Sequence, residues 1–228
     1  MFPFFDRTML LLIPALLFAG WAQMKVKSTF AYYSGVRSRR GVTADQVARM
    51  LLDRFGMSSV PVNRVSGQLT DHYDPRDRTL SLSDSVYGSS SIAAIGVAAH
   101  EVGHAIQHNV GYAPLALRNN IVPVVNLVSG GALPLFFMGF LFQSGSLMNL
   151  GILLFLGVVV FHIVTLPVEY NASSRAIAIL DQTGALGPDE LQGAHRVLNA
   201  AAWTYVAATL MAVMQVVRLL ALRNSREN

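Results

Sequence analysis

The sequence reads IVPVVNLVSGGALPLFFMGFLF over Ile121–Phe142 and LMNLGILLFLGVVVFHIVTLPV over Leu147–Val168, with only Gln143-Ser144-Gly145-Ser146 between the two runs. Both runs lie inside fifty consecutive positions, 119–168, that contain no Asp, Glu, Lys or Arg. A helix needs about 20 apolar residues to cross the hydrocarbon core of a bilayer, and each run is long enough. Two such runs joined by a short polar turn predict a transmembrane helical hairpin at 121–168.

The composition also favours a protein of the lipid bilayer over a soluble one. The 228 residues are 53% hydrophobic and 13% charged, whereas soluble domains carry roughly 25% charged residues. The net charge of +4 is small and scattered along the chain, which excludes a nucleic-acid partner. The absence of cysteine excludes a disulfide framework, a thiolate metal site and a cysteine nucleophile. Any metal must therefore be held by histidine and carboxylate side chains.

Two further apolar segments predict membrane spans near the ends of the sequence. Thr8–Met24 contains Trp21 close to its end and is followed by two lysines, so we expect an uncleaved transmembrane anchor at 8–24. A cleaved signal peptide is the alternative. Pro188 and the two acids after it form a strong helix start, which predicts one long helix over 188–222 that ends in a transmembrane span. The expected fold class is a mainly α membrane protein with about four transmembrane helices.

Most of the remaining polar chain lies at 25–118 and predicts one small α+β domain. Thr43-Ala44-Asp45-Gln46 is a capping box that begins an amphipathic helix. Val60–Leu69 and Thr79–Ser83 have strand character, and the turn signal Asp74-Pro75-Arg76-Asp77 lies between them. We therefore expect the two runs to form a hairpin. The strand at Thr79–Ser83 is a candidate free edge for an extended substrate.

The helix expected to end near Val110 contains the motif His100-Glu101-Val102-Gly103-His104. Two histidines four residues apart project from one face of a helix and can bind a single Zn²⁺ at roughly 2.0 to 2.1 Å. Glu101 lies about 100° around the helix from His100, where it can take a proton from zinc-bound water without being a ligand. The alternative is a pair of core histidines that hydrogen-bond to protein, with Glu101 at the surface.

A third ligand must come from elsewhere in the chain. His108 lies eight residues from His100, about 12 Å along the helix axis, so it cannot share the same metal. A hairpin of two spans returns the chain to the side that it left, and the first charged residue after it is Glu169. We expect Glu169 to be the third ligand, on a helix over 169–186, and Ser173 to be a hydrogen-bond partner one turn later. The weaker ligand candidates are His72, His195 and Asp181, and the alternative for Glu169 is an ion pair with Arg175.

Three segments resemble a known family. Gly67–Arg76 (GQLTDHYDPR), His100–Gln107 (HEVGHAIQ) and Pro167–Ser173 (PVEYNAS) are similar to the YugP-like neutral zinc metallopeptidases of bacterial membranes, and the resemblance covers nearly the whole chain. A more distant similarity connects the layout to membrane gluzincins of the HtpX and CAAX-prenyl-protease type. Those proteins have an aspartate where this chain has Ser173. The resemblance implies a gluzincin-like fold for the polar domain and a zinc-dependent endopeptidase that acts on protein or peptide substrates.

The expected mechanism is hydrolysis of a peptide bond by metal-activated water. Glu101 would take the proton of the water and pass it to the leaving amine, and a further donor would face the developing oxyanion. The sequence offers four candidates for that donor, namely Tyr205, His195, His72 and Tyr73.

Other functions are consistent with parts of the pattern. A non-catalytic membrane scaffold would keep the spans without a metal, and a metal-binding membrane protein such as a transporter would place its ligands within the spans. An intramembrane protease of the site-2 type would need an Asp-bearing span, which the uncharged tract lacks. The resemblance implies a multi-pass protein of the bacterial inner membrane, and the distribution of Lys and Arg predicts that its catalytic domain faces the cytoplasm.

Overall fold

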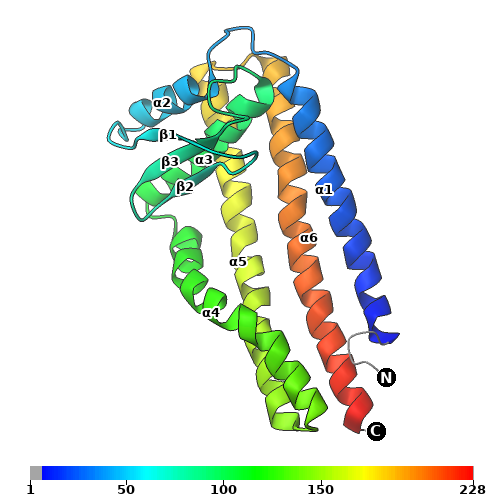
Figure 1. Cartoon of the computed structure of the whole chain (residues 1–228). Helices are drawn as coiled ribbons and strands as arrows, with labels where there is room; N and C mark the ends of the chain where they lie inside the picture. Colours follow the sequence, from blue (N-terminus) through cyan, green and yellow to red (C-terminus); the bar gives the residue numbers. More distant parts are fainter. Residues whose placement is uncertain (1–6, 228) are drawn as a thin grey trace. The chain divides into compact units, whose positions relative to one another are not determined.

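The computed structural model describes residues 7–227 and shows a mainly helical chain with one small sheet (Figure 1). In chain order the elements are the 3-10 helix η1 (Arg7–Leu12), α1 (Ile13–Ser34), α2 (Ala44–Arg54), β1 (Val62–Val65), β2 (His72–Asp74), β3 (Thr79–Ser83), α3 (Ile92–Asn109), α4 (Ala113–Leu141), α5 (Gly145–Thr183) and α6 (Pro188–Glu227). The described residues contain four helical segments that are long and apolar enough to cross a membrane: Arg7–Ser34, Ala113–Leu141, Gly145–Thr183 and Pro188–Ser225. The predicted fold class, a mainly α membrane protein with a small α+β part, is confirmed.

The described chain divides into two compact units. The first consists of residues 7–23, 116–167 and 204–227, and the second consists of Met24–Leu115 and Val168–Trp203. Each unit has its own buried apolar clusters.

The first unit contains the predicted helical hairpin, whose turn lies at 142–144. Two glycines allow α4 and α5 to pack closely: a Cβ at Gly139 would lie 2.6 Å from the backbone nitrogen of Met148, and a Cβ at Gly151 would lie 2.7 Å from that of Phe136. Phe136 is fully buried at this contact. Small residues that bring backbones together are the usual means of helix association in lipid.

The sheet of the second unit differs from the predicted hairpin. Its strand order is β1-β3-β2, with β1 parallel to β3 and β2 antiparallel to β3. The turn at Asp74-Pro75-Arg76-Asp77 therefore joins β2 to β3, and the hairpin between Val60–Leu69 and Thr79–Ser83 is wrong. The reason is the short strand β2, which the sequence pattern did not separate from its turn. Because β3 is the central strand and pairs on both sides, the expected free edge at Thr79–Ser83 is wrong as well.

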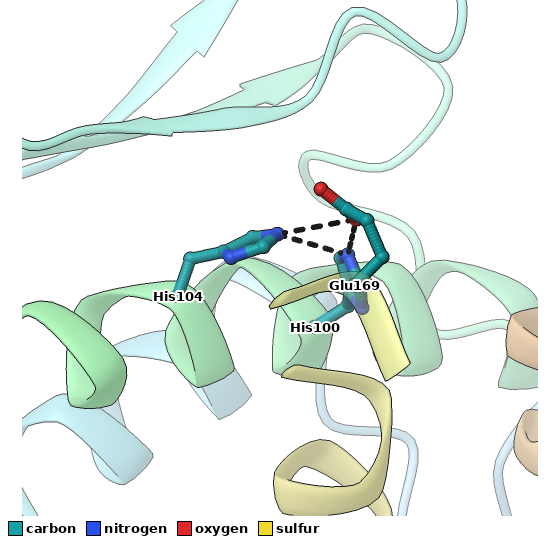
Figure 2. Close-up of side chains that lie close together, drawn as sticks. All are labelled: His100, His104 and Glu169. Atoms are coloured by element: carbon teal, nitrogen blue, oxygen red, sulfur yellow. Dashed lines mark hydrogen bonds and ion pairs between the residues drawn. The ribbon is translucent and has the colours of Figure 1, made fainter. Parts of the chain in front are cut away.

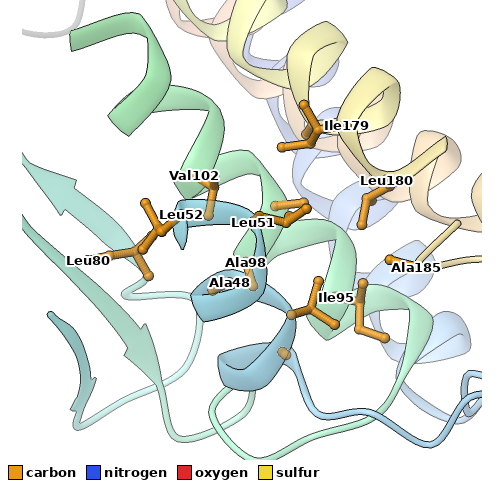
Figure 3. Packing of buried hydrophobic residues seen from close by; sticks show 14 of the residues in the cluster. Ala48, Leu51, Leu52, Leu80, Ile95, Ala98, Val102, Ile179, Leu180 and Ala185 are labelled. Atoms are coloured by element: carbon orange, nitrogen blue, oxygen red, sulfur yellow. The ribbon is translucent and has the colours of Figure 1, made fainter. Parts of the chain in front are cut away.

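Helix α3 is the centre of the second unit, and Figure 3 shows its apolar side chains between those of α2 and α5. Ser91 caps this helix, since its hydroxyl accepts a hydrogen bond from the backbone nitrogen of Ala94 at 3.2 Å. Ile95, Ala98 and Val102 are fully buried. They belong to one cluster with Ala48, Leu51, Leu52, Leu80, Ile179, Leu180 and Ala185. A helix that is apolar on all sides is buried because no face of it favours water.

Helices α3 and α5 touch backbone to backbone at Gly103. A Cβ at this position would lie 2.5 Å from the carbonyl oxygen of Ala172. Real side chains do not come so close to a backbone atom, so the crossing of α3 and α5 requires glycine at position 103. The crossing fixes which residues of the two helices face each other.

Replacing Gly103 with alanine should destabilise the protein, although alanine normally favours a helix. Overpacking of this kind costs about 1–3 kcal/mol or more, because a backbone carbonyl cannot turn away as a side chain can. The measurement is the Tm of purified protein in detergent. Gly157→Ala on α5 is the matched control, because a Cβ there meets no atom within 4 Å. A Tm for Gly103→Ala equal to that of the control would contradict the crossing.

Candidate metal centre

Three side chains from α3 and α5 converge on one point (Figure 2). His100 Nε2 lies 3.3 Å from Glu169 Oε2, His104 Nε2 lies 3.5 Å from the same oxygen, and the two Nε2 atoms are 3.1 Å apart. Among residues 7–227 this is the one group of three or more His, Asp or Glu side chains close enough to share a metal. The structure therefore brings together the three residues that the sequence predicted as ligands.

The triangle of ligand atoms has the size of one face of a zinc tetrahedron. With bonds of roughly 2.0 to 2.1 Å, two ligand atoms of a tetrahedral site are about 3.4 Å apart. The three observed separations lie on either side of that value. Two imidazole nitrogens and one carboxylate oxygen also form the donor set of many zinc hydrolases, in which the fourth position is left for water or substrate. The residues fit a zinc ion.

The electrostatics of the site favour a cation. Glu169 is 3% exposed and His104 is 9% exposed. Burial alone would lower the pKa of His104, but the hydrogen bond that Glu169 accepts from it and the negative charges of Glu101 and Glu169 outweigh burial, so the pKa of His104 is raised. The negative charges of two buried carboxylates thus favour a positive charge beside them, either a proton or a metal.

Glu101 is the second carboxylate of the site. Its side chain is 8% exposed, and no donor within the described residues 7–227 hydrogen-bonds or ion-pairs with it. A carboxylate in so little water is costly unless a cation or a proton donor compensates it. Its charge already acts on His104. Glu101 therefore lies close enough to the candidate ligand His104 for its negative charge to act there.

The Nδ1 atoms of His100 and His104, which point away from the triangle, both have a hydrogen-bond partner. Ser173 Oγ lies 3.1 Å from His100 Nδ1, in the place expected of it. His104 Nδ1 lies 3.0 Å from Oε1 of Gln107, a fully buried side chain that the sequence analysis did not single out. The available signal was a polar residue three positions after His104 on a helix with an otherwise apolar surface. Such contacts orient the imidazole rings and leave the two Nε2 atoms available to bind a metal ion.

The structure does not bring His72 or Tyr73 to the three ligands. His72 is exposed on β2, with Nδ1 2.9 Å from the carbonyl oxygen of Thr70. The hydroxyl of Tyr73 lies 2.9 Å from His108 Nδ1, and burial raises the pKa of Tyr73. Both side chains are therefore engaged with other partners.

The other two donor candidates lie on α6. His195 lines a cavity of about 390 Å³ between α5 and α6, together with Ser173. The rest of its lining is Tyr170, Ser174, Ile177, Leu198, Asn199 and Ala202. Tyr205 belongs to the first unit. Because Ser173 also contacts His100, the cavity is adjacent to a predicted ligand, and His195 has the better-supported position of the two.

Comparisons with known proteins point to one family. Residues 8–224 match the family described as "Putative neutral zinc metallopeptidase". The chain is 49% identical over 208 residues to a protein of Bacillus subtilis (strain 168) named "Putative membrane protease YugP", an alignment that covers 91% of this chain and 92% of the relative. No solved structure matches the chain.

The site predicts one zinc ion per chain, bound by two imidazoles and one carboxylate. Glu169→Gln keeps the shape of the side chain but removes the charge, so it should lower the zinc content of purified protein well below one equivalent, measured by mass spectrometry of the metal. His108→Ala is the matched control, because His108 hydrogen-bonds Tyr73 rather than the three ligands. Loss of zinc from the control but not from Glu169→Gln would refute the assignment.

Proposed function

Because the chain belongs to the neutral zinc metallopeptidase family, we propose that it is a membrane zinc endopeptidase whose metal ligands are His100, His104 and Glu169. The observation that carries this proposal is the triangle of His100 Nε2, His104 Nε2 and Glu169 Oε2, within the dimensions of a zinc tetrahedron. Two of these ligands are four residues apart on α3, and the third comes from α5, 65 positions after His104. That three potential ligand atoms from separate parts of the sequence lie together in a buried position supports a specific metal site.

The proposed chemistry is hydrolysis of a peptide bond. Zinc bound at the site would supply a Lewis acid that polarises the scissile carbonyl and lowers the pKa of a water molecule. Glu101 takes one proton from that water, the remaining hydroxyl group adds to the carbonyl carbon, and Glu101 passes the proton to the amine as the C–N bond breaks. The atoms of one water are thus divided between the new carboxyl group and the new amine.

We infer that His195 stabilises the oxyanion or orients the substrate, because it lines the cavity beside Ser173. The cavity combines apolar side chains with a few polar ones, as is usual for ligand sites. The proposed substrates are membrane proteins or peptides close to the membrane, since Glu169 follows directly on an apolar run long enough to span the bilayer.

The decisive experiment is the Glu101→Gln substitution in purified full-length protein. The amide has the size of the carboxylate but cannot accept the proton of water. Cleavage of a test protein such as casein should therefore fall by about 10² to 10⁴-fold, while zinc content stays at one equivalent.

Three results would overturn the proposal or part of it. Retained cleavage by Glu101→Gln would remove this residue from the mechanism. A parent protein that binds no zinc and cleaves nothing would instead support the non-catalytic membrane scaffold. A parent protein that binds zinc without cleaving any protein or peptide would support a metal-binding membrane protein.

We propose that the catalytic domain faces the cytoplasm of a bacterial cell, with the protein in the inner membrane. Reporter fusions after Ser146, in the turn between α4 and α5, test this orientation. An alkaline phosphatase fusion there should be active and a green fluorescent protein fusion dark, because the turn would lie outside the cytoplasm. The opposite pattern would reverse the topology. Fusions after Gln182, near the end of α5, are the matched control on the other side.

A further inference from the structure

Gln107 connects the two helices that supply the proposed ligands. It lies on α3, one turn after His104, and its side chain is fully buried. Oε1 lies 3.0 Å from His104 Nδ1, and Nε2 donates to the carbonyl oxygen of Val168 at 2.8 Å and to Oδ1 of Asn171 at 3.0 Å. Val168 and Asn171 both belong to α5, where they lie on either side of Glu169 in the sequence. One amide group thus uses both of its hydrogens and its oxygen.

The direction of these hydrogen bonds follows from chemistry. A backbone carbonyl oxygen can only accept, so the atom of Gln107 that faces Val168 must be the nitrogen. The oxygen of Gln107 must then face His104, and an amide oxygen can only accept. His104 must therefore carry a proton on Nδ1. A neutral imidazole with Nδ1 protonated has its lone pair on Nε2, the atom that faces Glu169 and His100.

The hydrogen bond between Arg175 and Asn171, which extends this network, also has only one possible direction. Arg175 has donors and no acceptor, and its Nε lies 2.8 Å from Oδ1 of Asn171. Oδ1 of Asn171 therefore faces both Arg175 and the nitrogen of Gln107. Four side chains, Arg175, Asn171, Gln107 and His104, form one chain of hydrogen bonds with a donor-only group at one end. The remaining polar atom in contact with it, the carbonyl oxygen of Val168, is an acceptor only.

We propose that Gln107 is a positioning residue that places the proton of His104 on Nδ1 and so presents Nε2 to the metal. The proposal rests on the metal site proposed above. His100 differs, because its partner Ser173 has a hydroxyl group that can donate or accept, so this contact does not select a tautomer. Gln107 therefore gives His104 a fixed ligand geometry, and at the same time it joins α3 to the segment of α5 that carries Glu169.

A packing role and a polar role predict different outcomes for two substitutions of equal size. Gln107→Glu replaces the donating nitrogen with an oxygen, which would face two oxygen acceptors, Val168 and Asn171. Asn171→Asp keeps an acceptor opposite Arg175 and Gln107, both of which donate to it. If Gln107 only filled space, the two isosteric changes would have similar effects. If the direction of the hydrogen bonds matters, Gln107→Glu is disruptive and Asn171→Asp is tolerated.

The experiment measures the affinity for Zn²⁺ alone by competition with a chromogenic chelator. It uses full-length protein in detergent, with Glu101→Gln as the parent background so that no self-cleavage occurs. Gln107→Glu should weaken zinc binding by about 10- to 100-fold, as loss of such a partner typically does, whereas Asn171→Asp should bind zinc as the parent does. Equal affinities for the two variants, or an equal loss in both, would overturn the proposal. A parent that binds no zinc would contradict the metal site itself, which is a different failure.

A second measurement needs no substitution at Gln107 and covers the case in which Gln107→Glu does not fold. In ¹⁵N-histidine spectra of the zinc-loaded parent, His104 should show a proton on Nδ1 that exchanges slowly with water, and coordination through Nε2. The signal of His104 is identified by its absence from a His104→Gln sample. Coordination through Nδ1, or an Nδ1 proton that exchanges as fast as that of the exposed His72, would overturn the proposal.

Discussion

The backbone contact between Gly103 and Ala172 is the constraint on which the site depends. No side chain larger than hydrogen can stand at position 103, because a Cβ would lie 2.5 Å from the carbonyl oxygen of Ala172. Because the two backbones are in contact here, side chains near this point on one helix reach the other helix. His104 lies next to Gly103 in the sequence, and Glu169 lies three positions before Ala172. The contact thus selects both the helix pair and its register.

The same interface contains the polar groups that most oppose burial. A carboxylate, two imidazoles, two primary amides and a hydroxyl group lie between two helices that otherwise contribute mainly apolar side chains to the core. Each polar group is compensated by another from the opposite helix: Ser173 for His100, Gln107 for Val168 and Asn171, and Glu169 for both histidines. A slip of one residue between α3 and α5 would leave several of them without partners, each at a cost of about 1–3 kcal/mol. The polar groups therefore define the register as strictly as the glycine does.

The sequence predicts those features whose cause is local. The spans follow from uninterrupted apolar runs, the start of α2 from its capping box at Thr43 and Gln46, and the candidate ligands His100 and His104 from their spacing of four on one helix. Glu169 was predicted through connectivity, because a hairpin returns the chain and Glu169 is the first charged residue after it. The order of the sheet was not predictable in this way, since the pairing of β1 with β3 depends on a three-residue strand, β2, with no pattern of its own. The role of Gln107 was not predictable from the local pattern, because two of its three partners lie 61 and 64 positions away.

Ser173 and Gln107 give the proposed centre a character that differs from the usual pairing of histidine ligands with carboxylates. A carboxylate on Nδ1 raises the basicity of an imidazole ligand and donates electron density to the metal. Here both partners are neutral, and the network behind Gln107 ends at the cation Arg175. Two carboxylates, Glu101 and Glu169, already balance the two charges of a zinc ion, so an aspartate at position 173 would make the buried site negative overall. With serine there, a zinc ion bound at the proposed site would remain a stronger Lewis acid, and Glu101 would be the carboxylate left to accept a proton.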